Sequence, residues 1–326
     1  MRPFACPEPV YAALDLGTNN CRLLIARPVA VGSFRVIDAF SRIVRLGEGV
    51  SRTRRLSESA MQRTLSALRV CGVKLERRGV TVMRAVATEA CRRADNCGEF
   101  VDRAERETGI RIEIISAEEE ARLAVAGCAP LLDPATPYAL VFDIGGGSTE
   151  LMWLAIGRDG RPSLVDEISV PHGVVGLAEQ YGGDRVPEET YRAMVAEVTG
   201  ALAGFGDRNG IRAAALAGGM QMLGTSGTVT TLAGIHLGLR RYERALVDGT
   251  YLEVRHARDV TRRLLDLDCA GRAAYPCIGH DRADLVVAGC AILDAITEAW
   301  PVDRMRIADR GLREGILSDL IEGGRA

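Results

Sequence analysis

The sequence FDIGGGST occupies residues 142–149 and places an aspartate, three consecutive glycines and two hydroxyl residues in one stretch. A related sequence, DLGTNN, occupies residues 15–20. Apolar segments flank both stretches, at 10–14 and 23–26 in the first half and at 138–142 and 151–156 in the second. Each half therefore predicts the order strand, Asp-x-Gly turn, strand, turn, strand. This repetition indicates a duplicated domain.

The remainder of the chain predicts helices that alternate with strands, as in an α/β sheet covered on both faces. Ser57 begins a helix that ends at Gly79, and Ser116 begins another, in which Glu119 completes a capping box and Gly127 closes the helix. A proline-bearing linker at 133–137 separates the two halves. Further strands are predicted at 81–87, 111–115 and 212–217, and further helices at 97–108, 187–205, 228–237, 256–267, 283–298 and 311–321.

Composition restricts the class of partner. The chain has 326 residues, of which 47% are hydrophobic and 26% are charged, as is usual for a soluble globular protein. The net charge of −2 provides no overall basic field for nucleic acid. Residues 1–135 are net basic and residues 136–326 are net acidic, so we expect an anionic ligand to be attracted to the first half.

The cysteines and the apolar stretches indicate in which cellular compartment the protein is expected. The nine cysteines are an odd number and contain no Cys-x-x-Cys pair, which fits neither a zinc site nor a disulfide framework. Residues 1–14 contain no long apolar run, so we expect no signal peptide. Residues 213–239 contain no charged side chain, but their glycines and hydroxyls indicate a buried strand, a loop and a helix rather than a membrane span. We therefore expect a cytoplasmic protein that binds neither membranes nor nucleic acid.

The glycine-rich turns indicate phosphate binding. Glycine lets the backbone approach an anion closely, and successive N–H groups form an anion-binding concavity. Ser and Thr add donors, and the aspartate can order Mg²⁺ or water beside a phosphate. One such turn alone is weak evidence, because Asp-Gly turns are common in hairpins. Here two equivalent copies occur, and a third loop, GTSGT at 224–228, opens onto a helix N-terminus.

These segments carry a resemblance to the actin, hexokinase and heat-shock-chaperone ATPase superfamily. Within it, the sequence resembles the exopolyphosphatase and guanosine pentaphosphate phosphatase family, in its short two-domain form. The matching segments, in the order of the family, are DLGTNNCRL at 15–23, ATEACRRADN at 87–96, IISAEEEARL at 114–123, FDIGGGSTEL at 142–151, GTSGT at 224–228, RADLVVAG at 282–289 and GLREG at 311–315. Asn20 departs from the Ser or Thr that is usual in the family, and Ala117 departs from the commoner Gly.

The resemblance implies an α/β fold of two duplicated actin-like (ribonuclease H-like) lobes with a cleft between them. We expect lobe I at 1–134, lobe II at 135–310, and a C-terminal helix at 311–326 that packs back on lobe I. The two Asp loops would then face each other across the cleft. The resemblance also implies a homodimer and a role in the stringent response.

The implied reaction is hydrolysis of the terminal phosphoanhydride of polyphosphate, guanosine pentaphosphate, or both, with guanosine tetraphosphate as a related ligand. The family position of its general base matches Glu120. Adjacent helical residues point about 100° apart, so Glu118, Glu119 and Glu120 cannot all face one site. Asp143 and Glu150 match the remaining acidic pair and are expected to hold Mg²⁺ or another divalent cation.

The expected phosphate-binding residues come from the three loops and from two arginines whose guanidinium groups suit bidentate phosphate contact. They are Asp15, Gly17, Thr18, Asn19, Asn20, Arg22, Arg92, Gly145, Gly146, Gly147, Ser148, Ser226, Gly227 and Thr228. Arg282 is a weaker candidate. The four histidines show no ligand spacing, and no cysteine lies in a motif that would lower its pKa.

Two alternatives from other classes remain open at the level of sequence. A kinase or ATPase of the same fold would use the loops for ATP, but no motif for an adenosine pocket is evident. A non-catalytic sensor of guanosine tetraphosphate would bind without turnover, although the presence of Glu120, Asp143 and Glu150 argues against it.

Overall fold

The computed structural model describes residues 9–30 and 33–323. Residues 1–8, part of the stretch for which we expect no signal peptide, lie outside the described residues. The chain divides into two compact units. The first unit contains the described residues up to Ser116 together with those from Leu312 onward, and the second unit is Ala117–Gly311.

The first unit is built on a five-stranded sheet with the order β3-β2-β1-β4-β5. β1, β2 and β3 form an antiparallel meander, β4 runs parallel to β1, and β5 runs parallel to β4. The strands are β1 (Tyr11–Leu16), β2 (Asn20–Ala30), β3 (Ser33–Ile43), β4 (Val82–Ala87) and β5 (Glu113–Ile114). The helices are α1 (Val50–Thr53), α2 (Glu58–Arg78), α3 (Glu89–Arg93), α4 (Cys97–Thr108) and α14 (Leu312–Gly323).

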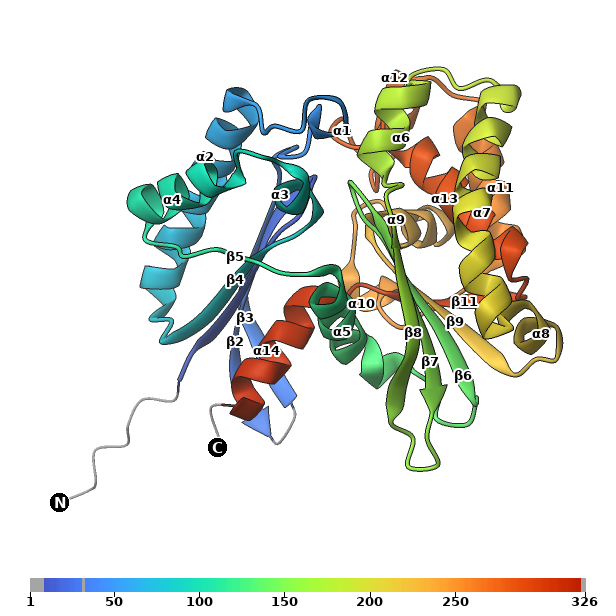
Figure 1. Ribbon diagram of the computed structural model, residues 1–326, viewed down its shortest axis with the longest axis horizontal. Coiled ribbons are helices and arrows are strands. Elements are labelled where there is room, and N and C mark those ends of the chain that lie inside the picture. The colour runs from blue at the N-terminus through green and yellow to red at the C-terminus, as the bar shows by residue number, and fades with distance from the viewer. Residues whose placement is uncertain (1–8, 31–32, 324–326) are drawn as a thin grey trace. The chain divides into compact units, whose positions relative to one another are not determined.

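Helices cover both faces of this sheet. Leu14 and Leu16 of β1 join Leu65 of α2 and Phe100 of α4 in one buried core. Because side chains alternate along a strand, Asp15 points to the opposite face. That face is covered by α14, which packs on β1, β2 and β4 (Figure 1). A half-buried aspartate near the end of a central strand therefore lies between the sheet and α14 within the first unit.

The second unit contains a six-stranded sheet with the order β10-β11-β9-β6-β7-β8. β6, β7 and β8 form an antiparallel meander, and β9 runs parallel to β6, as β4 does to β1. The strands are β6 (Tyr138–Ile144), β7 (Thr149–Ile156), β8 (Pro162–Val170), β9 (Met220–Thr225), β10 (Tyr251–Glu253) and β11 (Arg304–Ala308). The shared order confirms the predicted duplication and the α/β class.

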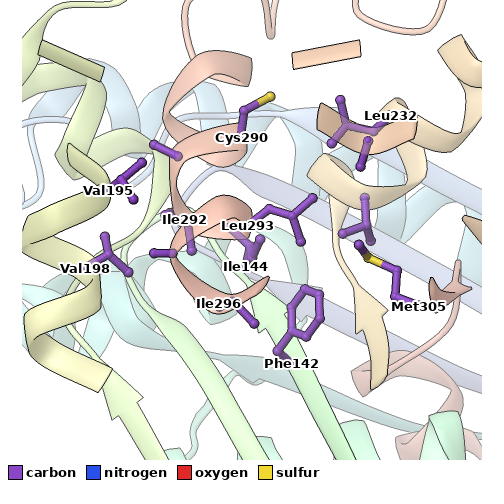
Figure 2. Packing of buried hydrophobic residues seen from close by; sticks show 14 of the residues in the cluster. Phe142, Ile144, Val195, Val198, Leu232, Cys290, Ile292, Leu293, Ile296 and Met305 are labelled. Carbon is purple, nitrogen blue, oxygen red and sulfur yellow. The ribbon is translucent and has the colours of Figure 1, made fainter. Parts of the chain in front are cut away.

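The helices of the second unit are α5 (Ala117–Cys128), the 3₁₀ helix η1 (Ala129–Leu131), α6 (Val174–Tyr181), α7 (Glu188–Asn209), α8 (Ile211–Leu216), α9 (Gly227–His236), α10 (Arg244–Val247), α11 (Val254–Leu265), α12 (Cys269–Ala273) and α13 (Val286–Ala299). Figure 2 shows one face of the sheet, where Phe142 and Ile144 point into a core lined by Val198 of α7 and by Ile292 and Ile296 of α13.

The other face of the second sheet is covered by α5. Ala121 and Ala124 of α5 pack with Val141 of β6 and Met152 of β7. Asp143 follows Val141 by two residues and therefore lies on the same face of the sheet as α5. This position corresponds to that of Asp15 in the first unit.

Two expectations differ from the structure. A strand was expected at 212–217, but residues 211–216 form helix α8, because three consecutive alanines favour helix. The strand of this region is β9, which begins eight residues after the expected start. The units divide after Ser116 rather than after residue 134, because α5 packs on β7 and β8. The Ser57 side chain accepts a hydrogen bond from the Ala60 N–H, which confirms its predicted capping of α2.

Within the described residues, no helix combines the length and the hydropathy that crossing a membrane requires.

Candidate functional site

The loop between β6 and β7 is a tight turn closed by its own backbone. The Gly145 N–H donates to the Ser148 carbonyl at 2.9 Å. The carbonyls of Gly145 and Gly146 accept hydrogen bonds from the N–H groups of Val174 and Val175, at 3.0 and 2.9 Å. Gly145 therefore shapes the loop, and the N–H groups of Gly146 and Gly147 remain as donors for an anion, since the described residues give them no backbone acceptor.

The loop between β1 and β2 repeats this arrangement. The Gly17 N–H donates to the Asn20 carbonyl at 2.9 Å. The Thr18 carbonyl accepts from the Gly47 N–H at 2.9 Å, and the Asn19 carbonyl accepts from the Val44 N–H at 2.8 Å. In both units the segment that follows the third strand therefore holds the carbonyls of the turn, and the N–H groups within the turn have no backbone acceptor among the residues that the structure describes.

A glycine after the third strand packs closely against the turn in both units. A Cβ on Gly173 would lie 2.4 Å from the Gly146 carbonyl carbon, and a Cβ on Gly47 would lie 2.3 Å from Cγ2 of Thr18. A side chain at position 173 would displace the backbone of its turn, and one at position 47 would displace the Thr18 side chain. The two glycines thus fix both phosphate-type loops against the rest of their own units.

A row of polar side chains crosses the second sheet beside its loop. Asp143 lies directly opposite Thr225 of β9 and directly opposite Glu150 of β7, and Glu150 lies opposite Ser169 of β8. Directly opposed residues share one face of a sheet. Glu150 is 4% exposed, and its Oε1 accepts hydrogen bonds from the hydroxyls of Ser148 at 2.6 Å and Ser169 at 2.9 Å. Two carboxylates are therefore held side by side at the end of the central strands.

The equivalent row of the first sheet has a different charge. Asp15 lies opposite Arg22, which takes the place of Glu150, and Arg22 lies opposite Ser41. Burial raises the pKa of Asp15, while the nearby guanidinium groups of Arg22 and of Arg313 on α14 lower it. The first unit thus supplies its own cations to its aspartate, whereas the second unit places a second acid beside Asp143.

The third loop forms the N-terminus of α9. The Ser226 hydroxyl oxygen accepts from the N–H groups of Thr228 at 3.2 Å and Val229 at 3.3 Å, so it caps the helix and leaves its own hydrogen to donate. Nη1 of Arg282 lies 3.8 Å from the position that a Cβ on Gly227 would occupy. Arg282, which the sequence made only a weak candidate, therefore has its guanidinium group beside this loop.

The three glutamates at the start of α5 differ in surroundings. Both carboxylate oxygens of Glu119 accept from Arg122, at 2.7 and 3.0 Å. Glu118 raises the pKa of Glu167, after the larger effect of burial. Glu120 precedes Ala124 by one helical turn and so shares the stripe of α5 that packs on the second sheet. Glu118 precedes Ala121 of the same stripe by three residues, so Glu118 and Glu120 both lie near this face of the sheet, whereas Glu119 is paired with Arg122.

Other predicted residues are held as follows. Arg92 on α3 donates to the Ile115 carbonyl at 3.1 Å and to Glu89 Oε2 at 3.0 Å. Asn19 is 7% exposed. The side-chain amide oxygens of Asn19 and Asn20 are buried, and no donor among the described residues forms a hydrogen bond to them. Such buried orphan oxygens are uncommon and suit a ligand or water that donates to them.

Two residues beside the predicted acidic side chains, Ser169 and Arg313, were not among the residues predicted from the sequence. Ser169 lies on the third strand of the meander, and only the register of β7 with β8 places it beside Glu150. Arg313 belongs to the matching segment GLREG, but its effect on Asp15 depends on the packing of α14 on β1. Ser169 could be found from the sequence only by working out the register of three consecutive strands. Arg313 could be found from the family resemblance of residues 311–315.

Comparison with known proteins gives a consistent result. The family described as the Ppx/GppA phosphatase family matches residues 24–323. A guanosine-5'-triphosphate,3'-diphosphate pyrophosphatase of Aeromonas hydrophila is 33% identical over 314 residues, which cover 96% of this chain and 60% of that protein. A Haemophilus influenzae protein named "Putative exopolyphosphatase" is 31% identical over 319 residues, covering 95% of this chain and 90% of that one.

Among solved structures, the Ppx/GppA family member of Aquifex aeolicus has a TM-score of 0.78 and 28% identity, covering 98% of this chain and 100% of that chain. The chain spans only about 60% of the length of the Aeromonas relative. The similarity therefore extends over both units of this chain and leaves part of that relative unmatched.

We predict that Gly173→Ala lowers the free energy of unfolding by about 1–3 kcal/mol, because the added methyl group must displace the Gly146–Gly147 backbone. Gly176→Ala on α6 is the matched control, since a Cβ there meets nothing within 4 Å, and alanine is favoured over glycine in helices. Thermal and denaturant unfolding would measure both. Equal stability of the two variants would contradict the close packing at Gly173.

Proposed function

This chain belongs to the Ppx/GppA phosphatase family, and from that premise we propose that it hydrolyses a terminal phosphoanhydride and releases orthophosphate. The substrate class is inorganic polyphosphate, guanosine pentaphosphate, or both. The names of the Aeromonas and Haemophilus relatives support these two substrates. Both substrates present the same terminal group, so one site can serve either.

The observation that carries the proposal is the row Thr225–Asp143–Glu150–Ser169 beside the Gly145–Gly147 turn. The turn offers backbone N–H groups to phosphate oxygens, and the row offers carboxylates on the same edge of the sheet. Phosphoryl transfer requires little beyond positioning and charge neutralisation, together with a base that takes a proton from the attacking water. This edge contains groups of each kind.

We assign roles to the chain's own residues on this basis. Glu120 accepts the proton of the attacking water as general base. The backbone N–H groups of Gly146, Gly147, Ser148 and Gly227 donate hydrogen bonds to phosphate oxygens, and the hydroxyl groups of Ser226 and Thr228 donate as well. In the first unit, Thr18, Asn19, Asn20, Arg22 and Arg92 contact the substrate phosphates, and Gly17 and Asp15 shape and orient that loop.

The residues of the second sheet fit a divalent cation. Asp143 and Glu150 are cross-strand neighbours, whose Cβ atoms lie about 4.5–5.5 Å apart in such pairs. Two like charges about 4 Å apart repel by roughly 1–4 kcal/mol, depending on the effective dielectric. No cluster of three or more Asp, Glu, His or Cys side chains with metal-site geometry occurs in the described part of the chain. Two carboxylates with phosphate oxygens and water are the usual surroundings of Mg²⁺. When bound, the ion would neutralise the carboxylates and the phosphoryl oxygens.

The setting of this activity is also a proposal. The eight cysteines among the described residues are free thiols, which supports the reducing cytoplasm. We further propose a homodimer that acts in the stringent response, on the basis of family membership.

A comparative assay tests the proposed function. Orthophosphate release is measured from long-chain polyphosphate, tripolyphosphate and guanosine pentaphosphate, with no other nucleotide present. Release from at least one of them supports hydrolysis. Release that requires added ADP or ATP would indicate a kinase, and binding of guanosine tetraphosphate without any turnover would indicate a sensor.

We predict that Glu120→Gln retains substrate binding but loses turnover by about 10²–10⁴-fold, because the amide keeps the shape of the side chain without its basic lone pair. Glu119→Gln is the matched control, since its carboxylate pairs with Arg122, and it should turn over near the unmodified rate. Steady-state kinetics and equilibrium binding measure the two effects. The reverse pattern would mean that the base is assigned to the wrong glutamate.

We predict that excess EDTA abolishes turnover and that Mg²⁺ restores it. Ser169→Ala should raise the Mg²⁺ concentration needed for half-maximal rate by about 10–100-fold, because a hydroxyl that orients Glu150 is lost. Ser163→Ala, on the same strand, is the control, since its hydroxyl donates only to the Ala155 carbonyl among the described residues. Full activity in EDTA would show that turnover needs no divalent cation and would contradict this role of Asp143 and Glu150.

A further inference from the structure

A pocket of about 470 Å³ lies on the first unit, between α1 and the start of α2. Its lining includes Arg52, Arg55 and Arg63, with Glu48 as the one carboxylate. Arg63 is committed to structure, since it donates to Glu48 at 2.7 Å and to the Val44 carbonyl at 2.9 Å. The lining therefore has an excess of positive charge.

Arg52 and Arg55 supply that excess. Both are exposed, and within the described residues neither guanidinium group has a carboxylate at ion-pair distance. Their neighbour Arg54 differs, because its guanidinium lies 3.3 Å from Asp95. Two uncompensated guanidinium groups in one pocket suit an anion with several oxygens, because a planar guanidinium can donate two hydrogen bonds to one phosphate.

The pocket is joined directly to the predicted phosphate loop of the same unit. The Gly47 N–H donates to the Thr18 carbonyl at 2.9 Å, and Gly49 of the pocket lining follows Gly47 by two residues, a span of at most about 7 Å. Arg45, two residues before Gly47, and Arg54, which ends helix α1, have positive φ values of 49° and 54°. Such backbone is uncommon for residues other than glycine and concentrates at ligand-binding segments.

We propose that this pocket is a second phosphate site, which binds a phosphate group of the substrate other than the one that is cleaved. The inference rests on the proposed function, because it takes the substrate to be a molecule with several phosphates. Arg52 and Arg55 hold the distal phosphate, and the loop at residues 17–20 holds a phosphate nearer the cleaved end. The site would give a ligand to two of the arginines in the net basic stretch of residues 1–135.

The experiment compares two double variants of equal charge change. Arg52→Gln with Arg55→Gln removes the pocket cations but keeps Arg63, whose loss would disturb the fold. Arg77→Gln with Arg111→Gln is the control. Arg77 lies near the end of α2 and Arg111 precedes β5, so both are at the amino end of the sheet, away from the loops. KM is measured for long-chain polyphosphate, tripolyphosphate and guanosine pentaphosphate. Binding of long-chain polyphosphate is measured by calorimetry over a salt series.

For the pocket variant, we expect the ratio of KM for long-chain polyphosphate to KM for tripolyphosphate to rise about 10–100-fold. The slope of log affinity against log salt should fall by about one to two. A rise in KM confined to guanosine pentaphosphate would also support the site and would identify the 3′-diphosphate as its occupant. Unchanged ratios and slope, or the same changes in the control variant, would overturn it. If the unmodified protein hydrolyses none of these substrates, the proposed function fails, and the salt series still decides whether the pocket binds phosphate.

Discussion

Two carboxylates on neighbouring strands, those of Asp143 and Glu150, set the main physical constraint on the second unit. The register of β6 with β7 places the two residues directly opposite each other. Glu150 is almost fully buried, so its side chain has little freedom to move away. Hydroxyl donors from Ser148 and Ser169 stabilise the ionised form of Glu150. They hold Glu150 beside Asp143, and we propose that a divalent cation bound from outside the chain reduces the repulsion between the two carboxylates.

Duplication gives the two units one backbone design and two charge patterns. Each unit has a meander of three strands, a turn closed by a glycine N–H, and a glycine after the third strand that lets the next segment hold the turn. In the first unit, Arg22 stands where Glu150 stands in the second. One copy thus places an arginine beside its aspartate and the other places a glutamate there, and we propose that the second copy binds phosphate together with a cation. The pocket beside α1 extends the cationic character of the first copy.

Much of this could be predicted from the sequence, because the deciding signals are local. The Asp-x-Gly turns follow apolar strands, and the capping of α2 by Ser57 depends on residues three positions apart. The role of Ser169 could not be predicted in this way, because it depends on strand register across a β-bulge between Trp153 and Leu154. Residues 211–216 were misassigned because an alanine-rich apolar run fits a short strand and a short helix equally well. The pocket segment that carries Arg52 and Arg55 includes left-handed backbone at Arg54. The sequence does not predict this conformation, because arginine rarely adopts it.

The most direct test of the central claim is the location of a bound divalent cation. Crystals grown with Mn²⁺ and phosphate would reveal the ion by its anomalous X-ray scattering. We predict one ion beside Asp143 and Glu150, its loss in the Glu150→Gln variant, and none beside Asp15, where Arg22 already supplies positive charge. An ion bound at Asp15, or no ion at Asp143 in a protein whose turnover requires a divalent cation, would contradict this prediction.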